Sequence, residues 1–286
     1  MTVELREVSA AGFRFRCRLA GPAEGEPVIL LHGFPETSRM WLPVMERLAA
    51  EGYRCLAPDQ RGYSPGARPR GVEHYTYAHL AGDVLALANV FDMPRFHLVG
   101  HDWGAGVGWA VLAIDPDRVA SFSALSVPHL AAFGRAIRED EDQRQRSQYI
   151  QFFLEEGAAE AALTANDFAA LRRIWSAHSP EEIEEYLRTF REPGALTAAL
   201  NWYRASRGID PEDEEVRFGL VHTPTLLIWG NRDQAIGRAA VEAAAAYMAG
   251  PYRFVELDAG HWLVQEAGER VTEEIRRHLR QNPIPT

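Results

Sequence analysis

Residues 99–106 read VGHDWGAG and complete the apolar run FHLVG of residues 96–100. A β-rich run, a glycine-rich turn and a helical run predict a strand that turns sharply into a helix. The spacing Gly-x-acid-x-Gly is that of a nucleophile elbow with Asp102 at its tip, and the tight turn requires small residues at Gly100 and Gly104. An aspartate that caps a helix N-terminus would produce the same local pattern.

Short β-rich runs alternate with helical runs along the rest of the chain, which predicts a mostly parallel sheet flanked by crossover helices, an α/β fold. The opening segments, roughly 2–9 and 12–19, show strand-like alternation and could add an antiparallel edge. The other expected strands are residues 27–31, 53–58, 96–100, 122–127, 225–230 and 252–257, and the expected helices are about 77–91, 103–114, 239–249 and 262–280.

The β pattern stops for about 90 residues after residue 127, where charged helical sequence rich in Glu, Arg and Ala replaces it. This interruption predicts a core of residues 1–127 and 215–286 with a helical cap, residues 128–214, inserted into it. A cap over the carboxyl ends of the strands would close the place where open α/β sheets bind ligands. The alternative is a surface embellishment that never contacts a ligand.

Composition narrows the classes of partner. The 286 residues are 47% hydrophobic and carry a formal net charge of −10 without a Lys/Arg block, so a small-molecule ligand is expected and a nucleic-acid or membrane partner is not. Neither a signal peptide nor a membrane-spanning run is recognisable, which favours a cytoplasmic location. With no H-E-x-x-H, no paired Cys/His set and no phosphate or dinucleotide loop, we expect neither a metal nor a cofactor.

Three further motifs stand on loops that follow expected strands, which is where a hydrolase places its catalytic groups. LLHGFPE at residues 30–36 places Phe34 where a loop would supply one backbone N–H of an oxyanion hole, and the N–H of Trp103 would supply the other. Asp233 follows the expected strand 225–230, and His261 follows the expected strand 252–257. The order nucleophile, acid, histidine is that of the α/β-hydrolase triad, so Asp102, Asp233 and His261 are the predicted catalytic group.

These motifs resemble the epoxide hydrolase branch of the α/β-hydrolase superfamily, and the resemblance runs over nearly the whole chain. Its carriers are HGFPE (32–36), GHDWG (100–104), QYIQFFLEEGAAE (148–160), LNWYR (200–204), Asp233 and GHW (260–262). The family implies a pair of cap tyrosines that hold the epoxide oxygen, and the matching positions are Tyr149 and Tyr203. Amphipathic packing of the cap would also explain both rings. DQRGYSPG (59–66) and Glu156 depart from the usual pattern.

A carboxylate nucleophile indicates the chemistry. It can open a strained epoxide to a vicinal diol by forming an alkyl ester, which water activated by His261 then hydrolyses. A haloalkane or haloacid dehalogenase with the same triad is the alternative enzyme. Phe34 stands where haloalkane dehalogenases usually carry asparagine, and Trp103 and Gly106 stand where fluoroacetate dehalogenases carry arginines. A non-catalytic ligand-binding protein on the same scaffold is the alternative of another class.

Overall fold

The computed structural model describes residues 3–206 and 218–285, and its centre is an eight-stranded sheet of order β1-β2-β4-β3-β5-β6-β7-β8. β1 pairs with β2 and β2 with β4 in antiparallel fashion, and the remaining neighbours are parallel. The strands are β1 (Glu4–Ala10), β2 (Phe13–Ala20), β3 (Pro27–Leu31), β4 (Arg54–Pro58), β5 (Phe96–His101), β6 (Val119–Leu125), β7 (Thr225–Gly230) and β8 (Tyr252–Leu257). The predicted α/β fold and its antiparallel edge are confirmed.

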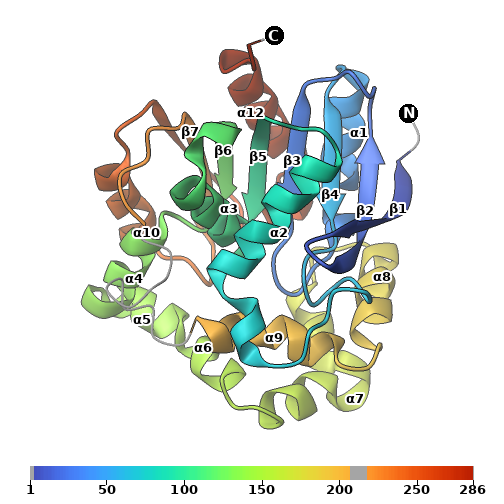
Figure 1. Ribbon diagram of the computed structural model, residues 1–286. Coiled ribbons are helices and arrows are strands. Elements are labelled where there is room, and N and C mark those ends of the chain that lie inside the picture. The colour runs from blue at the N-terminus through green and yellow to red at the C-terminus, as the bar shows by residue number, and fades with distance from the viewer. Residues whose placement is uncertain (1–2, 207–217, 286) are drawn as a thin grey trace.

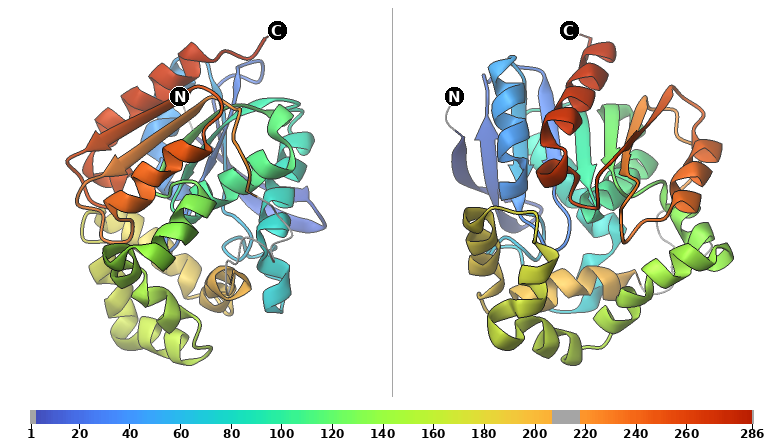
Figure 2. Two further views of the ribbon diagram at one scale, coloured as in Figure 1. Left: turned by 90° about the vertical axis from the view of Figure 1, so that its left-hand side faces the viewer. Right: turned by 180° about the vertical axis from the view of Figure 1, so that it is seen from behind.

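Helices cover both faces of this sheet. Figure 1 shows α2 (Tyr77–Val90) and α3 (Trp103–Ile114) on one face, and the reverse view in Figure 2 shows α1 (Leu42–Ala50) and α12 (Gly268–Gln281) on the other. Every residue of β5, β6 and β7 is buried. Mostly apolar strands that are buried along their whole length are typical of parallel strands covered on both sides.

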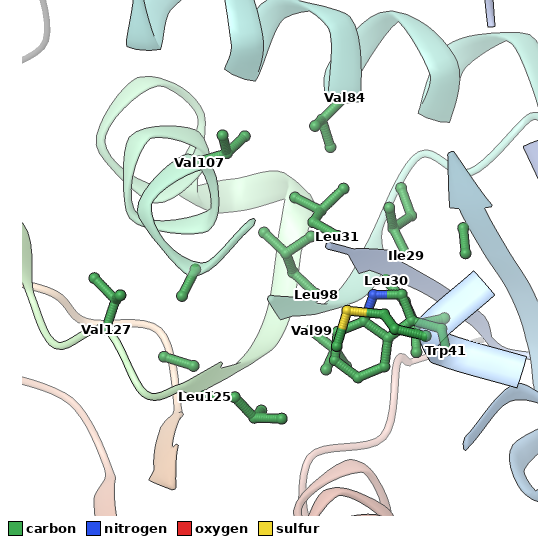
Figure 3. Packing of buried hydrophobic residues seen from close by; sticks show 14 of the residues in the cluster. Ile29, Leu30, Leu31, Trp41, Val84, Leu98, Val99, Val107, Leu125 and Val127 are labelled. Atoms are coloured by element: carbon green, nitrogen blue, oxygen red, sulfur yellow. The ribbon is translucent and has the colours of Figure 1, made fainter. Parts of the chain in front are cut away.

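The core around β3 and β5 shows how the two layers hold the central strands. Leu31 and Leu98 lie toward Val107 of α3, whereas Val99 lies beside Trp41 (Figure 3). All five side chains are almost fully buried. Burial of this extent contributes about 1.5–3 kcal/mol for each large apolar side chain, so the ends of β3 and β5, from which two site loops depart, are firmly placed.

The described residues between β6 and β7 contain six helices, which form a layer at one end of the sheet (Figures 1 and 2). They are α4 (Leu130–Glu139), α5 (Glu141–Arg146), α6 (Gln148–Phe153), α7 (Ala158–Ile174), α8 (Pro180–Phe190) and α9 (Ala195–Ala205). We call Leu130–Ala205 the helical insertion. The expected boundary between residues 214 and 215 lies outside the described residues.

Several element boundaries differ from the expectations. β6 begins at Val119 and ends at Leu125 rather than spanning 122–127, and the helix expected over 262–280 is α11 (Leu263–Glu266) followed by α12, with a non-helical break at Ala267. The helix expected over 239–249 is α10 (Arg238–Ala243) and a 3-10 turn. In the described part of the chain, no helix is both long and apolar enough to cross a bilayer.

Candidate active site

Asp102 lies at the turn between β5 and α3 with φ 54° and ψ −122°, a conformation that L-residues rarely adopt. Its backbone N–H donates to the carbonyl of Leu125 on the neighbouring strand (3.2 Å). Gly104 packs so closely on β3 that a Cβ would overlap the carbonyl oxygen of Leu31. The elbow therefore holds a strained backbone in place, and Asp102 is buried, with 7% of the residue exposed.

The loop after β3 supplies a donor to this carboxylate. The backbone N–H of Phe34 donates to Oδ1 of Asp102 at 2.9 Å, and a Cβ on Gly33 would overlap the Asp102 side chain. His32 is buried and turned away, because its Nε2 accepts from the backbone N–H of Gln60 (3.1 Å). Trp103 is the first residue of α3. The loop thus brings the Phe34 amide to one carboxylate oxygen and leaves the other oxygen for a different partner.

That partner is His261, on the loop after β8. Its Nε2 lies 3.5 Å from Oδ2 of Asp102, and its Nδ1 lies 3.0 and 3.1 Å from the two carboxylate oxygens of Asp233. The structure therefore brings together the three residues that the sequence predicted as a triad. Their spacing is that of a nucleophile, an imidazole and an orienting acid.

The charges of this cluster shift the pKa values of His261 and Asp233 in opposite directions. Burial opposes protonation of His261, but the charges of Asp233 and Asp102 raise its pKa well above the ordinary value. Burial would raise the pKa of Asp233, yet the charge of His261 and hydrogen bonds from His261 and Ser126 hold that pKa below the ordinary value. The resting site therefore favours an imidazolium between two carboxylates.

Ser126 is a member of this cluster that the sequence reasoning missed. It follows β6 with φ 69°, its hydroxyl donates to Oδ2 of Asp233 at 2.7 Å, and its oxygen lies 3.1 Å from Nδ1 of His261. The backbone N–H groups of Ala235 and Ile236 donate to the other oxygen of Asp233 at 2.8 and 3.0 Å. With every oxygen bonded, the Asp233 carboxylate is fixed in orientation.

A cavity of about 210 Å³ opens beside Asp102 and His261, and the two predicted tyrosines line it. Tyr149 comes from α6 and Tyr203 from α9, with ring centroids 6.3 Å apart. The other lining residues are Phe34, Pro35, Phe153, Ile174, Gln234, Ala235 and Trp262. None of the last six was predicted as a site residue, although Pro35, Phe153 and Trp262 lie within the motifs HGFPE, QYIQFFLEEGAAE and GHW.

Both tyrosines keep their hydroxyl protons at neutral pH. Burial, reinforced by the negative charges of Asp102 and Asp233, raises the pKa of Tyr149, although the residue as a whole is 36% exposed. Burial raises the pKa of Tyr203 well above its ordinary value, while a contact with the Trp103 side chain acts in the opposite direction. Two protonated tyrosines, each able to donate a hydrogen bond, therefore line the same cavity as the carboxylate.

A second buried carboxylate, Glu36, lies behind the cavity. Its carboxylate is hydrogen-bonded to Nδ1 of His101 (3.2 Å), Nε2 of His178 (3.0 Å) and Nε2 of Gln265 (2.9 Å). Burial alone would raise the pKa of Glu36, but the hydrogen bonds and charges of the two histidines lower it to about 2. We call Glu36, His101, His178 and Gln265 the Glu36 cluster. Its glutamate belongs to the HGFPE motif, which was the available signal.

Comparison with known proteins defines the family. The family model described as "alpha/beta hydrolase fold" matches residues 26–267. The chain is 33% identical to Epoxide hydrolase A of Mycobacterium tuberculosis over 96% of each chain, and 30% identical to AB hydrolase superfamily protein YfhM of Bacillus subtilis, over 97% of this chain and 98% of that protein. The crystal structure of Epoxide Hydrolase A from Mycobacterium thermoresistibile superposes with a TM-score of 0.88 at 30% identity, covering 99% of this chain and 100% of that one.

The chain belongs to the α/β-hydrolase fold family and is a hydrolase. Within this family its relationship is to the epoxide hydrolases, as the sequence predicted. Among the residues that the structure describes, no group of three or more His, Cys, Asp or Glu side chains is placed to hold a metal ion.

Proposed function

We propose that this hydrolase opens epoxides to vicinal diols through a covalent alkyl ester on Asp102. One observation carries the proposal: a carboxylate at the tip of a strained elbow lies between a backbone donor and a histidine, at a cavity that two tyrosines also line. Similarity to proteins named epoxide hydrolase supports the same reaction. The reactants are a small epoxide and water.

The first step uses Oδ2 of Asp102 as the nucleophile. Oδ1 accepts the Phe34 N–H, so Oδ2 is the oxygen free to form a bond with an epoxide carbon. As that bond forms, the carbon–oxygen bond of the ring breaks and the epoxide oxygen takes up negative charge. Tyr149 and Tyr203 donate hydrogen bonds to this oxygen, and one of them supplies the proton that makes it a hydroxyl.

The second step depends on a change in the charge around His261. Formation of the ester neutralises Asp102, which removes one of the two negative charges that raise the His261 pKa. The imidazolium then passes its proton through solvent to the tyrosinate left by the first step, and the neutral ring accepts a proton from water, while Asp233 keeps the ring oriented. The hydroxide that forms attacks Cγ of Asp102, and the Phe34 and Trp103 amides stabilise the resulting oxyanion. Collapse of this intermediate breaks the bond between Cγ and Oδ2, and His261 gives a proton to that oxygen as it leaves with the diol. The new carboxyl group of Asp102 then returns a proton to His261.

Residues 128–214 would act as the cap of this site. The insertion contributes Tyr149 and Tyr203 to the cavity, along with Phe153 and Ile174. Because the cap would carry the acid groups and exclude water from Asp102, ester formation would depend on the cap lying closed over the site.

The tyrosines also favour an epoxide over an alkyl halide as the substrate. An alkoxide that stays attached to the substrate needs a proton donor, whereas a departing halide needs donors that solvate an anion. Trp103 packs edge-on against Tyr203 with centroids 4.9 Å apart, and its side chain interacts with that residue. Phe34 offers no side-chain donor at the position where haloalkane dehalogenases carry asparagine.

A single turnover in ¹⁸O-labelled water tests the ester route. With enzyme in excess over a terminal epoxide, the label should appear in the Asp102 peptide and the first diol should carry an unlabelled aspartate oxygen, because water attacks the enzyme ester. Mass spectrometry of the digested enzyme and of the diol measures both. Label that enters only the diol would exclude the ester and leave direct attack by water.

A further inference from the structure

The cavity is small for its kind. Its volume of about 210 Å³ lies below the ~300–1,000 Å³ of pockets that bury drug-sized ligands. The substrate must place its epoxide between Asp102 and the two tyrosines, so the remaining volume accommodates only a short or single-ring substituent.

The lining also restricts charge. Among the described lining residues none is Lys, Arg or Glu, and Asp102 is the only carboxylate. A carboxylate on the substrate would be buried beside Asp102, and the positive charge of His261 is already balanced by Asp102 and Asp233, so its burial is strongly unfavourable. Among the described lining residues, Gln234 and Trp262 carry the polar side-chain atoms outside the proposed reacting groups, and neither side chain is charged. An uncharged, apolar substituent therefore fits the cavity.

One part of the wall is held rigidly by aromatic packing. Phe153 makes edge-to-face contacts with Phe34, Tyr149 and Tyr203 at centroid distances of 5.4, 5.4 and 5.0 Å. Because Phe153 touches both tyrosines, shortening it would disturb the proposed acid groups as well as the volume. This side of the wall cannot set substrate size independently of catalysis.

Ile174 differs from the aromatic wall. It is a half-buried aliphatic residue at the carboxyl end of α7, and the next residue, Trp175, is fully buried against Tyr186 (5.4 Å) and Phe190 (6.3 Å). The packing of Trp175 fixes this end of the helix, so the Ile174 side chain has a defined position in the lining. Its methyl and methylene groups can be removed without losing a ring contact to either tyrosine.

We propose that Ile174 sets the upper size of the substrate, and that the substrates are uncharged epoxides with a short or single-ring apolar substituent. This inference rests on the proposed function, whose site it deepens. One methylene in an apolar pocket can change discrimination between substrates by roughly tenfold or more. Ile174→Ala removes three carbons and should extend the range to larger epoxides.

The experiment compares Ile174→Ala with Ile183→Ala. Ile183 is also a half-buried isoleucine of the insertion, on α8, and it does not line the cavity. Diol formation from 1,2-epoxybutane and from a naphthyl glycidyl ether gives kcat/KM for a small and a large substrate. Ile174→Ala should shift the ratio toward the large substrate by about tenfold or more, and Ile183→Ala should leave it within about twofold. An equal shift in both variants, or none in Ile174→Ala, overturns the assignment.

Binding measurements separate this inference from the proposed function. Butane-1,2-diol and 3-(naphthyloxy)propane-1,2-diol are titrated against both variants and the parent by isothermal calorimetry. Turnover with an unchanged size ratio contradicts the role of Ile174 alone. Absence of turnover, with a gain in binding of the larger diol confined to Ile174→Ala, contradicts the epoxide reaction alone.

A pair of small substrates tests the restriction on charge. Glycidate should react at least about a hundredfold more slowly than uncharged glycidamide, and equal rates overturn the charge restriction.

Discussion

Two buried carboxylate–imidazole clusters lie one hydrogen bond apart in this protein. In one, His261 lies between Asp233 and Asp102; in the other, Glu36 lies between His101 and His178. Nε2 of His101 is 2.9 Å from the backbone carbonyl of His261, which joins them. The residue types and the degree of burial are similar, so neither feature distinguishes a catalytic cluster from a structural one.

Access to the cavity and backbone strain do distinguish them. Asp102 and His261 line the cavity, and Asp102 has a positive φ, whereas Glu36 is fully buried and none of the Glu36 cluster lines the cavity. Glu36 joins the loop after β3 to His178 of the insertion and to Gln265 near the carboxyl end of the chain. We infer that the first cluster serves chemistry and the second holds the insertion on the core.

The largest expected effect separates the two imidazoles. His261→Gln should allow alkylation of Asp102 but slow hydrolysis of the ester by up to about 10⁴-fold, because only that step needs a base. Intact-protein mass spectrometry after mixing with a terminal epoxide measures the adduct. His178→Gln is the matched control from the Glu36 cluster and should cycle without accumulating adduct. Normal cycling by His261→Gln would remove His261 from the role of base.

A smaller effect is expected at the acid groups. Tyr149→Phe and Tyr203→Phe keep the ring contacts but remove the hydroxyl donors, and each should slow alkylation by roughly a hundredfold. The double variant should be nearly inactive in that step, with circular dichroism unchanged. Stopped-flow measurement of alkylation reports the rate. If the double variant is alkylated at the parent rate, the two tyrosines are packing residues and the epoxide proposal loses its main specific support.

The sequence could predict the first cluster because its members follow strands. Asp102, Asp233 and His261 each come directly after or near the end of an apolar run, and parallel strands bring their carboxyl ends to one edge of the sheet. The positions of the strands say nothing about how individual side chains lie. It predicted which loops meet, and the loop residues with the right chemistry were few.

The rest depends on contacts that local sequence does not encode. Ser126 and His261 are 135 residues apart, and Glu36 and Gln265 are 229 apart. Ile174 carries no motif, because any apolar residue on the inner side of α7 would look the same in sequence. α1 was missed since it is nine residues long and has no side-chain N-cap. In each of these cases tertiary packing decides which residues meet or which segment becomes helical.

The Glu36 cluster should affect stability more than rate. Glu36→Gln removes the charge that two histidines share, and the pKa shift from 4.5 to about 2 corresponds to a loss on the order of 3 kcal/mol in the free energy of unfolding. Among the described residues no hydrogen bond joins Glu36 to His261 directly, and His101 links Glu36 to the backbone carbonyl of His261, so turnover should change by less than about tenfold. Urea unfolding at pH 7 measures the loss. Glu156→Gln, an exposed control in the insertion, should stay within about 0.5 kcal/mol of the parent.

The smallest effect is the pH dependence of that same stabilisation. Folding lowers the pKa of Glu36 from 4.5 to about 2, so its contribution is fully present above the unfolded value and is lost as pH falls toward the folded value. Between pH 6 and pH 3.5 the parent should lose on the order of 1 kcal/mol that Glu36→Gln does not lose. Other buried carboxylates, such as Asp233, titrate in both proteins and cancel in the difference. Urea unfolding across this range should therefore show the two stabilities converging on the acid side. A constant difference would mean that Glu36 stabilises the fold by its shape and hydrogen bonds and that its charge contributes nothing.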